Sequence, residues 1–166
     1  FSTGLSSRDL VTMLVMSWIL AICLGKKVGG YLNDISGAFD RVDSNILLAK
    51  LYEFGIGDQY LRFIEAYLKP RSGQAVVQGA FSELFEIANS VFQGTVLGPP
   101  LWNAFFADVS VPANSTGGRE AKFADDLNVF KEFPQKTDLS QVQTDLEKCK
   151  ARTHKWGRKN RVSFDA

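Results

Sequence analysis

Two adjacent aspartates, Asp125 and Asp126, stand between two short apolar segments, and this arrangement limits how the chain can fold. Residues 121–124 and 127–130 have the composition of β-strands, so we expect the aspartates at the tip of a tight hairpin. Neighbouring carboxylates repel each other, which is costly beside apolar strands unless a cation lies nearby. Taken alone, the segment fits a solvated turn and a site for a divalent cation such as Mg²⁺ equally well.

A third aspartate, Asp34, lies near the end of the short apolar segment 30–35 and just before a glycine-containing turn. If residues 30–35 form a strand, the sheet would hold this carboxylate and direct it into a cleft. The simpler interpretation is an aspartate that forms a turn or caps a helix.

A glycine-rich segment, residues 92–103, forms the third candidate element. Gly94 and Gly98 leave the backbone free to approach a ligand closely, and the amide of Gln93 could bond a base or sugar edge. The N-terminus of the helix expected after Pro99 would favour phosphate or another anionic group. Taken alone, the segment also reads as a loop before a buried helix.

Apolar spacing and turn residues predict an α+β fold, an antiparallel sheet with helices packed on one face. The expected helices cover residues 10–24, 44–54, 58–69, 99–109 and 138–156. Asp58 is expected to cap the third of these helices, and Thr137 or Asp138 the last. The expected strands cover residues 30–35, 75–78, 84–91, 121–124, 127–130 and 162–164.

Composition excludes several classes of protein. The single histidine, His154, excludes zinc sites built on paired histidines, and two separated cysteines exclude a disulfide framework. The apolar segment 10–24 has 15 residues, fewer than the ~20 that span a bilayer, and no cleavage site follows it. We therefore expect an intracellular protein that does not enter a membrane and whose chemistry rests on carboxylates, amides, hydroxyls, lysine or arginine.

Taken in order along the chain, the three candidate segments resemble motifs A, B and C of reverse transcriptases. The strings are DISGAFD (34–40), QGTVLGPPLWNAF (93–105) and FADD (123–126), and they look like the non-LTR retrotransposon type. Asn33 departs from the pattern, because many members carry a hydrophobic residue there. The resemblance extends over residues 10–164.

The resemblance implies the palm of a right-hand polymerase with part of the fingers. Under this interpretation residues 1–166 form a single partial reverse transcriptase domain. Residues 1–29 are a fingers-side helix remnant, residues 30–166 are the palm with the fingers–palm connection, and the thumb is absent.

The resemblance also implies a metal site and a reaction. Asp34 and Asp125 would hold two Mg²⁺ ions, with Mn²⁺ as an alternative, and the backbone carbonyl of Ile35 would assist. Asp126 would support this site, and the three aspartates are the catalytic candidates. The implied reaction is transfer of a nucleotide from a dNTP to the 3′-hydroxyl of a DNA primer on an RNA or DNA template.

Further residues follow from the same resemblance. Phe39 would lie under the nucleotide sugar and disfavour a 2′-hydroxyl, although it also fits a core phenylalanine. Gln93 and Gly94 would contact the incoming nucleotide and the template. The basic segment near the C-terminus is either a solvated surface or a phosphate-binding one. Its candidate residues are Lys148, Arg152, Lys155, Arg158 and Lys159.

Three functional hypotheses remain open from the sequence. The first is a reverse transcriptase core that needs fingers and thumb segments from a parent polyprotein, so that the isolated chain is weakly active or inactive. The second is a non-catalytic retroelement remnant that keeps the palm fold and binds nucleic acid without polymerising. The third, an RNA-templated RNA polymerase, is disfavoured because Phe39 is bulky where a ribonucleotide would place its 2′-hydroxyl.

Overall fold

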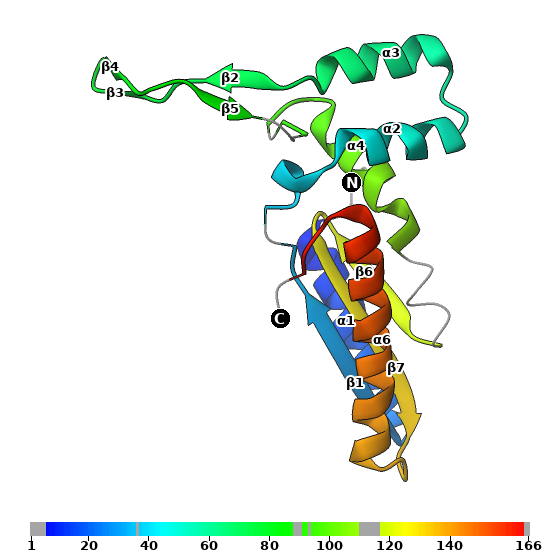
Figure 1. The fold of residues 1–166 in the computed structure, drawn as a ribbon. Helices are drawn as coiled ribbons and strands as arrows, with labels where there is room; N and C mark the ends of the chain where they lie inside the picture. The colour runs from blue at the N-terminus through cyan, green and yellow to red at the C-terminus, as the bar shows by residue number, and fades with distance from the viewer. Residues whose placement is uncertain (1–5, 36, 88–90, 93, 110–116, 165–166) are drawn as a thin grey trace. The chain divides into compact units, whose positions relative to one another are not determined.

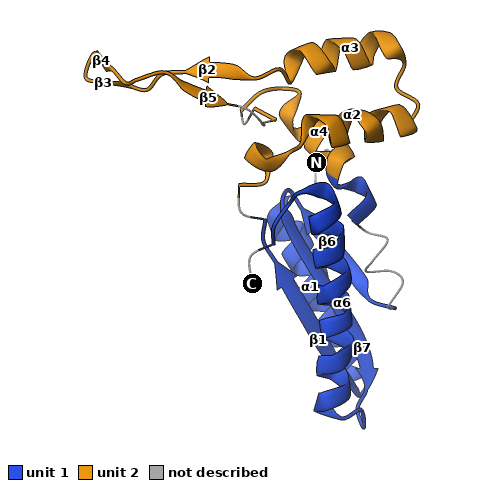
Figure 2. Ribbon diagram, in the orientation of Figure 1, with its two compact units in different colours: residues 1–36, 106–166 blue, residues 37–105 orange. Residues whose placement is uncertain are grey.

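The computed structural model divides the chain into two compact units (Figures 1 and 2). Unit 1 contains residues 1–36 and 106–166, and unit 2 contains residues 37–105. We describe each unit by itself. The described residues are 6–35, 37–87, 91–92, 94–109 and 117–164.

Unit 1 is built on a three-stranded antiparallel sheet in the order β1-β7-β6. This confirms the predicted α+β class and the antiparallel sheet. The elements are α1 (Ser7–Cys23), β1 (Lys26–Asn33), the 3₁₀ helix η2 (Ala107–Val109), β6 (Arg119–Phe123), β7 (Asp126–Pro134) and α6 (Leu139–Asn160).

The pairing of the strands confirms the predicted hairpin around the adjacent aspartates. β6 and β7 pair up to Phe123 and Asp126, which leaves Ala124 and Asp125 as the two turn residues. β7 also pairs along all of β1, from Lys26 opposite Pro134 to Asn33 opposite Leu127. β7 is therefore the central strand, and both neighbours are fixed in register against it.

Helix α1 covers one face of this sheet, which we call the α1 face. Leu14 of the helix forms a buried cluster with Ala121 and Phe130, and Val28 of β1 packs against that cluster. The ring of Trp18 meets Phe130 edge-on, with centroids 6.2 Å apart. The remaining sides of α1 leave large apolar residues exposed, among them Met13, Met16 and Ile22.

Helix α6 covers the opposite face, the α6 face. Gly29 of β1 has no side chain, and a Cβ built there would lie 3.1 Å from atoms of Val142 and Leu146, so the helix approaches the strand closely. Further along the helix, the hydroxyl of Tyr31 lies 2.9 Å from Nε2 of His154.

The structure differs from our expectation that helices pack on one face only. Side chains alternate along a strand, so Val28 and Tyr31 point to opposite faces, and each face has its own helix. The sequence does not reveal this alternation, because Gly29 and Gly30 have no side chains to show which face of the strand is apolar.

The two ends of α6 are fixed by specific contacts. Asp138 caps the first turn as predicted, since its side chain accepts a hydrogen bond of 2.9 Å from the Leu139 N–H. Near the other end, a Cβ on Gly157 would lie 2.6 Å from the Val162 carbonyl and 2.9 Å from the Phe164 ring. The predicted strand at 162–164 is reduced to one antiparallel bridge between Phe164 and Ile35.

Unit 2 combines helices with a two-stranded hairpin that extends from them (Figure 1). Asp43 caps α2, because its carboxylate accepts hydrogen bonds from the N–H groups of Asn45 and Ile46. Asp58, predicted to cap α3, is instead its first residue. The elements are η1 (Phe39–Arg41), α2 (Ser44–Glu53), α3 (Asp58–Tyr67), β2 (Arg71–Gly73), β3 (Val76–Val77), β4 (Ala80–Phe81), β5 (Phe85–Ile87) and α4 (Gly98–Phe106).

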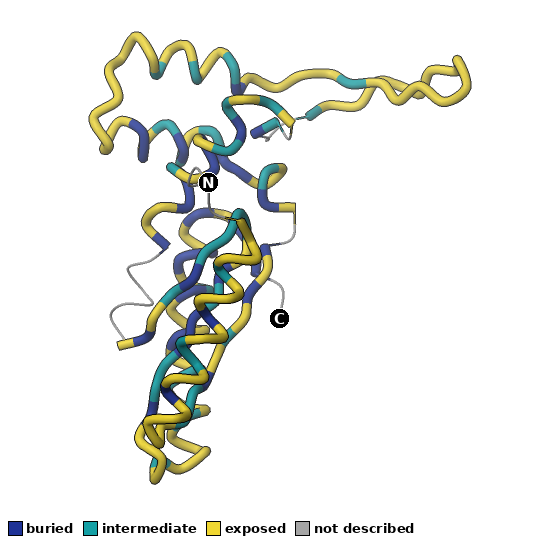
Figure 3. The backbone as a smooth tube through the Cα atoms, turned by 180° about the vertical axis from the view of Figure 1, so that it is seen from behind, coloured by how far each residue is buried: buried dark blue, intermediate teal, exposed yellow. Residues whose placement is uncertain are grey.

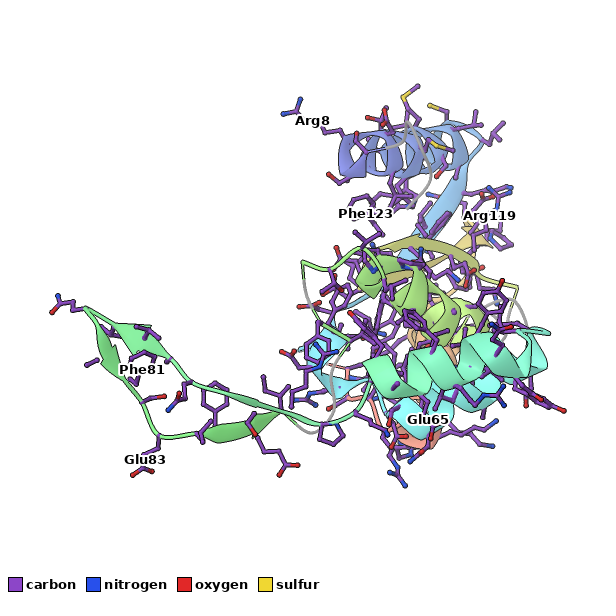
Figure 4. All side chains as sticks on the ribbon, turned by 90° about the horizontal axis from the view of Figure 1, so that it is seen from above. Arg8, Glu65, Phe81, Glu83, Arg119 and Phe123 are labelled. Carbon is purple, nitrogen blue, oxygen red and sulfur yellow. The ribbon has the colours of Figure 1, made fainter. Side chains whose placement is uncertain are left out.

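The hairpin of unit 2 is exposed along its length (Figure 3). β3 and β4 pair around a turn in which Gln78 and Gly79 both have positive φ, at 51° and 83°. Phe81, 71% exposed, projects near the tip (Figure 4). The predicted strand 84–91 is limited to β5, and residues 88–90 lie outside the described residues.

Gly157→Ala is expected to lower the free energy of unfolding by about 1–3 kcal/mol, because the new Cβ would overlap the Val162 carbonyl. Urea unfolding of the purified chain measures this change. Gly30→Ala is the control, since a Cβ there meets nothing within 4 Å and is expected to stabilise the strand by about 0.5–1 kcal/mol. Equal effects of the two variants would contradict the close contact at Gly157.

Candidate catalytic site

The register of the sheet brings the three candidate aspartates to one end of unit 1. Asn33 pairs with Leu127, so Asp34, the next residue on its chain, comes alongside Asp126, the residue that precedes Leu127. Asp126 also pairs with Phe123 on the other side, and Asp125 occupies the turn between them. Aspartates separated by about ninety residues of sequence are therefore neighbours in space.

Asp126 lies close enough to the other two carboxylates for their charges to act on it. The pKa of Asp126 is raised above its ordinary value, first by partial desolvation, then by the negative charge of Asp125 and then by that of Asp34. A carboxylate that accumulates such repulsion is stabilised by a cation placed among the three.

The carboxylates fit the donor set of a divalent cation without forming a closed cluster. Carboxylate oxygens are the ligands that Mg²⁺ prefers, and this ion usually takes only one or two of them together with water and substrate phosphates. Among the residues that the structure describes, no group of three or more acidic, histidine or cysteine side chains is close enough to surround an ion. Asp34 instead turns back on its own chain, where Oδ1 accepts a hydrogen bond of 2.8 Å from the Ile35 N–H.

The site lies on the open part of the α1 face. Alternation along the strands places Asp34 and Asp126 on the same face as Phe130. Leu32 belongs to this face and is 67% exposed, so α1 does not extend over this end of the sheet. The carboxylates are therefore accessible to a large ligand.

A separate shallow pocket of about 270 Å³ contains none of these carboxylates. Gly30 and Tyr31 of β1 and the first half of α6, from Leu139 to Lys150, line it. Because residues of α6 line this pocket, it is a different place from the aspartate site, which lies on the α1 face.

The turn that presents Asp125 has an unusual backbone. Ala124 has a φ of 53°, a left-handed conformation that costs a residue with a Cβ about 1–2 kcal/mol. Two-residue hairpin turns require positive φ values and normally use glycine or asparagine there. The sequence shows no such residue, so this conformation could not be read from it.

Asn33, the residue that departs from the motif A pattern, is a buried polar residue. Its side chain points to the α6 face and is 5% exposed, and neither amide atom has a hydrogen-bond partner within 3.5 Å in the described part of the chain. The side chain still acts on the Tyr31 phenol, where it opposes the rise in pKa that desolvation causes. A buried amide without a partner destabilises the fold. Asn33, directly before Asp34, therefore lowers the stability of the fold.

Ile35, the predicted source of a carbonyl ligand, is almost fully buried at 1% exposure. Its backbone forms the bridge to Phe164 and its N–H bonds the side chain of Asp34. These contacts fix the backbone beside the candidate carboxylate, while the role of the carbonyl stays a prediction.

The predicted nucleotide-binding residues belong to unit 2. The ring of Phe39 lies 5.6 Å from that of Trp102, and a Cβ on Gly98 would lie 3.7 Å from Phe39 Cε1. Phe39 thus packs on the first turns of α4, and its carbonyl accepts a 2.9 Å hydrogen bond from the Val91 N–H. The aromatic residue of the first segment and the glycine-rich segment are in direct contact.

Gly94 lies in the exposed turn before α4 with a φ of 82°, a conformation that favours glycine. A Cβ at this position would meet nothing within 4 Å. Gln93 lies outside the described residues.

The N-terminus of α4 is poorly suited to the phosphate binding that we expected there. The helix begins at Gly98, so Pro99 and Pro100 occupy its first turn and supply no N–H. The Gly98 N–H is already directed to the Thr95 hydroxyl at 3.2 Å. These residues remove the donors that normally bind an anion at a helix start.

The candidate basic residues all lie on α6 and are all exposed. Lys148 is 3.4 Å from Asp145, which also pairs with Lys131 at 2.8 Å. Arg158 acts with Lys150 on His154, whose pKa is lowered first by desolvation and then by these two positive charges. The five residues therefore do not form one uniform patch.

Comparison with known proteins places most of the chain in one family. The family model described as reverse transcriptase (RNA-dependent DNA polymerase) matches residues 23–163. An RNA-directed DNA polymerase from mobile element jockey of Drosophila melanogaster is 36% identical over 108 residues, which cover 62% of this chain and 12% of that protein. The corresponding protein of Drosophila funebris is 30% identical over 138 residues, 80% of this chain and 15% of the relative. The matches thus span less than a sixth of the length of these relatives.

A solved structure, apo telomerase from Candida tropicalis truncated from its C-terminal domain, resembles the chain with a TM-score of 0.58. The likeness covers 89% of this chain and 31% of the telomerase chain at 11% sequence identity. It shows the fold, an α+β arrangement like a polymerase palm. In the part of the chain that the structure describes, no helix is both long and apolar enough to cross a bilayer.

Asp126→Asn is expected to stabilise the metal-free protein at about pH 7, because it removes the carboxylate that its neighbours repel. The raised pKa means that the folded state keeps a proton which the unfolded state releases above about pH 3.9. The wild type therefore loses stability as the pH rises through this window, and the advantage of the variant should be absent in more acidic solution. Thermal unfolding in EDTA at a series of pH values measures the difference.

The control for this prediction is Glu83→Gln, which removes an exposed carboxylate on the hairpin of unit 2 (Figure 4). It should leave the unfolding temperature nearly unchanged over the same pH range. A variant Asp126→Asn that is less stable than the wild type at about pH 7 would exclude repulsion as the dominant effect.

Asn33→Leu is expected to raise the free energy of unfolding by about 1–3 kcal/mol, since it removes a buried amide without a partner. The same substitution at Asn160 is the matched contrast. Asn160 is also buried, but its amide donates a 2.9 Å hydrogen bond to the Trp156 carbonyl, so Asn160→Leu should destabilise. Urea unfolding measures both, and a loss of stability in Asn33→Leu would indicate a hydrogen bond at Asn33.

Proposed function

Because the chain belongs to the reverse transcriptase (RNA-dependent DNA polymerase) family and resembles its non-LTR retrotransposon type, we propose that it provides the catalytic palm of an RNA-directed DNA polymerase. The reaction would extend a DNA primer with dNTPs on an RNA or DNA template. The observation that carries this proposal is the electrostatic coupling of Asp126 to Asp125 and Asp34 at one accessible end of the sheet.

Asp34 and Asp125 would hold two Mg²⁺ ions, or Mn²⁺ in their place, with help from the Ile35 carbonyl and with Asp126 in support. The raised pKa of Asp126 and the exposure of this end of the sheet support that assignment. When bound, such ions lower the pKa of a primer 3′-hydroxyl and offset charge on the transferring phosphoryl group.

The residues of the chain would have separate tasks in this reaction. The strands β1 and β7 hold the carboxylates in register, and the Ile35 N–H orients Asp34. Phe39 would lie under the sugar of the dNTP, supported by its packing against Trp102, and would exclude a 2′-hydroxyl. Gln93 and Gly94 would contact the nucleotide and template. The fingers and thumb segments of a parent polyprotein would complete the substrate grip.

A non-catalytic remnant with the same fold is the second candidate. One observation favours it: the buried amide of Asn33 weakens the strand that carries Asp34. Under this alternative the chain would bind nucleic acid without extending a primer.

Primer extension on an RNA template with dNTPs and Mg²⁺ tests the first candidate. Asp125→Asn combined with Asp126→Asn should reduce any extension by at least about a hundredfold, because even outer partners of metal ligands contribute ten- to a hundredfold. Replacing dNTPs with ribonucleotides should abolish extension if Phe39 excludes the 2′-hydroxyl.

Mg²⁺ binding is measured on the same two proteins so that activity is not the sole criterion. Mg²⁺ at about 100 times its dissociation constant should stabilise the wild type by about 2.7 kcal/mol and should not stabilise the double variant. Stabilisation without extension would favour the remnant. If Mg²⁺ gives no stabilisation and no primer is extended, the proposed metal site would be excluded for this chain.

A further inference from the structure

Four basic residues on α6 share one line along the helix. Lys148, Arg152, Lys155 and Lys159 are separated by four, three and four residues, the spacing that keeps side chains on one face. All four are exposed, and they extend over about 16 Å of helix at 1.5 Å per residue. We call this line the basic stripe. Arg158 lies about a quarter turn away, with Lys150 and His154.

The basic stripe lies outside the face of α6 that is buried on the sheet. The residues that α6 buries include Cys149, Thr153, Trp156 and Asn160, which repeat at the same spacing one residue further along. Each residue turns the helix by about 100°, so the stripe lies well outside the buried face and toward solvent. None of its four members is needed to hold the helix on the sheet by burial.

The basic stripe and the carboxylates belong to opposite faces of unit 1. Asp34 and Asp126 lie on the α1 face, whereas α6 covers the face on which Gly29 and Tyr31 contact it. The sheet separates the two sets of charges. A nucleic-acid segment bound by the basic stripe is therefore a different segment from one that reaches the carboxylates.

Ordinary helix electrostatics do not account for the whole stripe. Positive charges near a helix C-terminus are favourable, but this effect is limited to the last turn, which here contains Arg158 and Lys159. Lys148 and Lys155 lie earlier. Asp145 compensates Lys148, and the sequence from 148 to 160 contains no acidic residue.

We propose that the basic stripe is a second RNA-binding surface, which holds the phosphate backbone of the single-stranded template outside the catalytic site. Basic side chains whose Cβ atoms lie about 5–6 Å apart along a helix suit successive phosphates and read no sequence. This assignment of the ligand rests on the proposed function, because a polymerase must hold template that has not yet been copied.

The experiment measures binding of a fluorescein-labelled oligouridylate RNA by anisotropy, in EDTA and over a range of salt concentrations. Lys155→Gln combined with Lys159→Gln should lower the salt slope of log K by about 1.4, because each phosphate contact on a single strand contributes about 0.7. The matched control is Arg8→Gln combined with Lys136→Gln, which removes the same charge from exposed positions of unit 1 outside α6. The control should keep the wild-type slope.

The variant Asp125→Asn/Asp126→Asn separates this proposal from the proposed function. It should bind the RNA with an unchanged slope, even if no protein extends a primer. Equal losses in the stripe variant and its control would show a general charge effect and overturn the proposal. An unchanged slope in the stripe variant would also overturn it and leave a solvated or protein-binding surface.

Discussion

The pairing of β1 with β7 is the constraint on which unit 1 depends. Eight residues of β1 are paired in one register, and the last pair, Asn33 with Leu127, determines that Asp34 meets Asp126. A slip by one residue would turn every side chain to the other face and move Asp34 away from the open end. The packing of Gly29 against α6 opposes a slip in the direction that puts Val28 in its place, because the side chain of Val28 would collide with Val142.

The two helices of unit 1 then divide the molecule into surfaces with different chemistry. α1 closes the middle of one face but stops short of Leu32, which leaves the carboxylate end open. α6 covers the other face and buries Leu127 and Asn33. The surface on that side of the sheet is therefore the solvent-facing side of α6. Negative charge is thus gathered on one side of a thin sheet, and positive charge on the other.

Local signals in the sequence were sufficient for much of this fold. The cap at Asp138 and the hairpin at Asp125 depend on a few neighbouring residues, and the structure confirms them. Features that depend on residues far away in the sequence could not be predicted from it. The burial of Asn33 depends on α6, which follows more than a hundred residues later, and the contact of Phe39 with α4 depends on the path of unit 2.

Three departures from favourable chemistry lie where the three aspartates meet. Ala124 adopts a backbone conformation suited to glycine, Asn33 buries an amide without a partner, and Asp126 sits beside two like charges. Each departure destabilises the apo protein. Unit 1 contains comparable departures elsewhere, since Arg161 has a φ of 59° and polar atoms of Trp18 and Glu120 are also buried without a hydrogen-bond partner among the described residues. A folded chain retains local strain only where the surrounding structure holds it, and such strain is typical of functional sites. A cation among the carboxylates would offset the repulsion at Asp126, although it would relieve neither the backbone of Ala124 nor the amide of Asn33. Cation binding can therefore offset only the destabilisation caused by charge repulsion at Asp126. That repulsion is the departure that is connected with the proposed metal-dependent reaction.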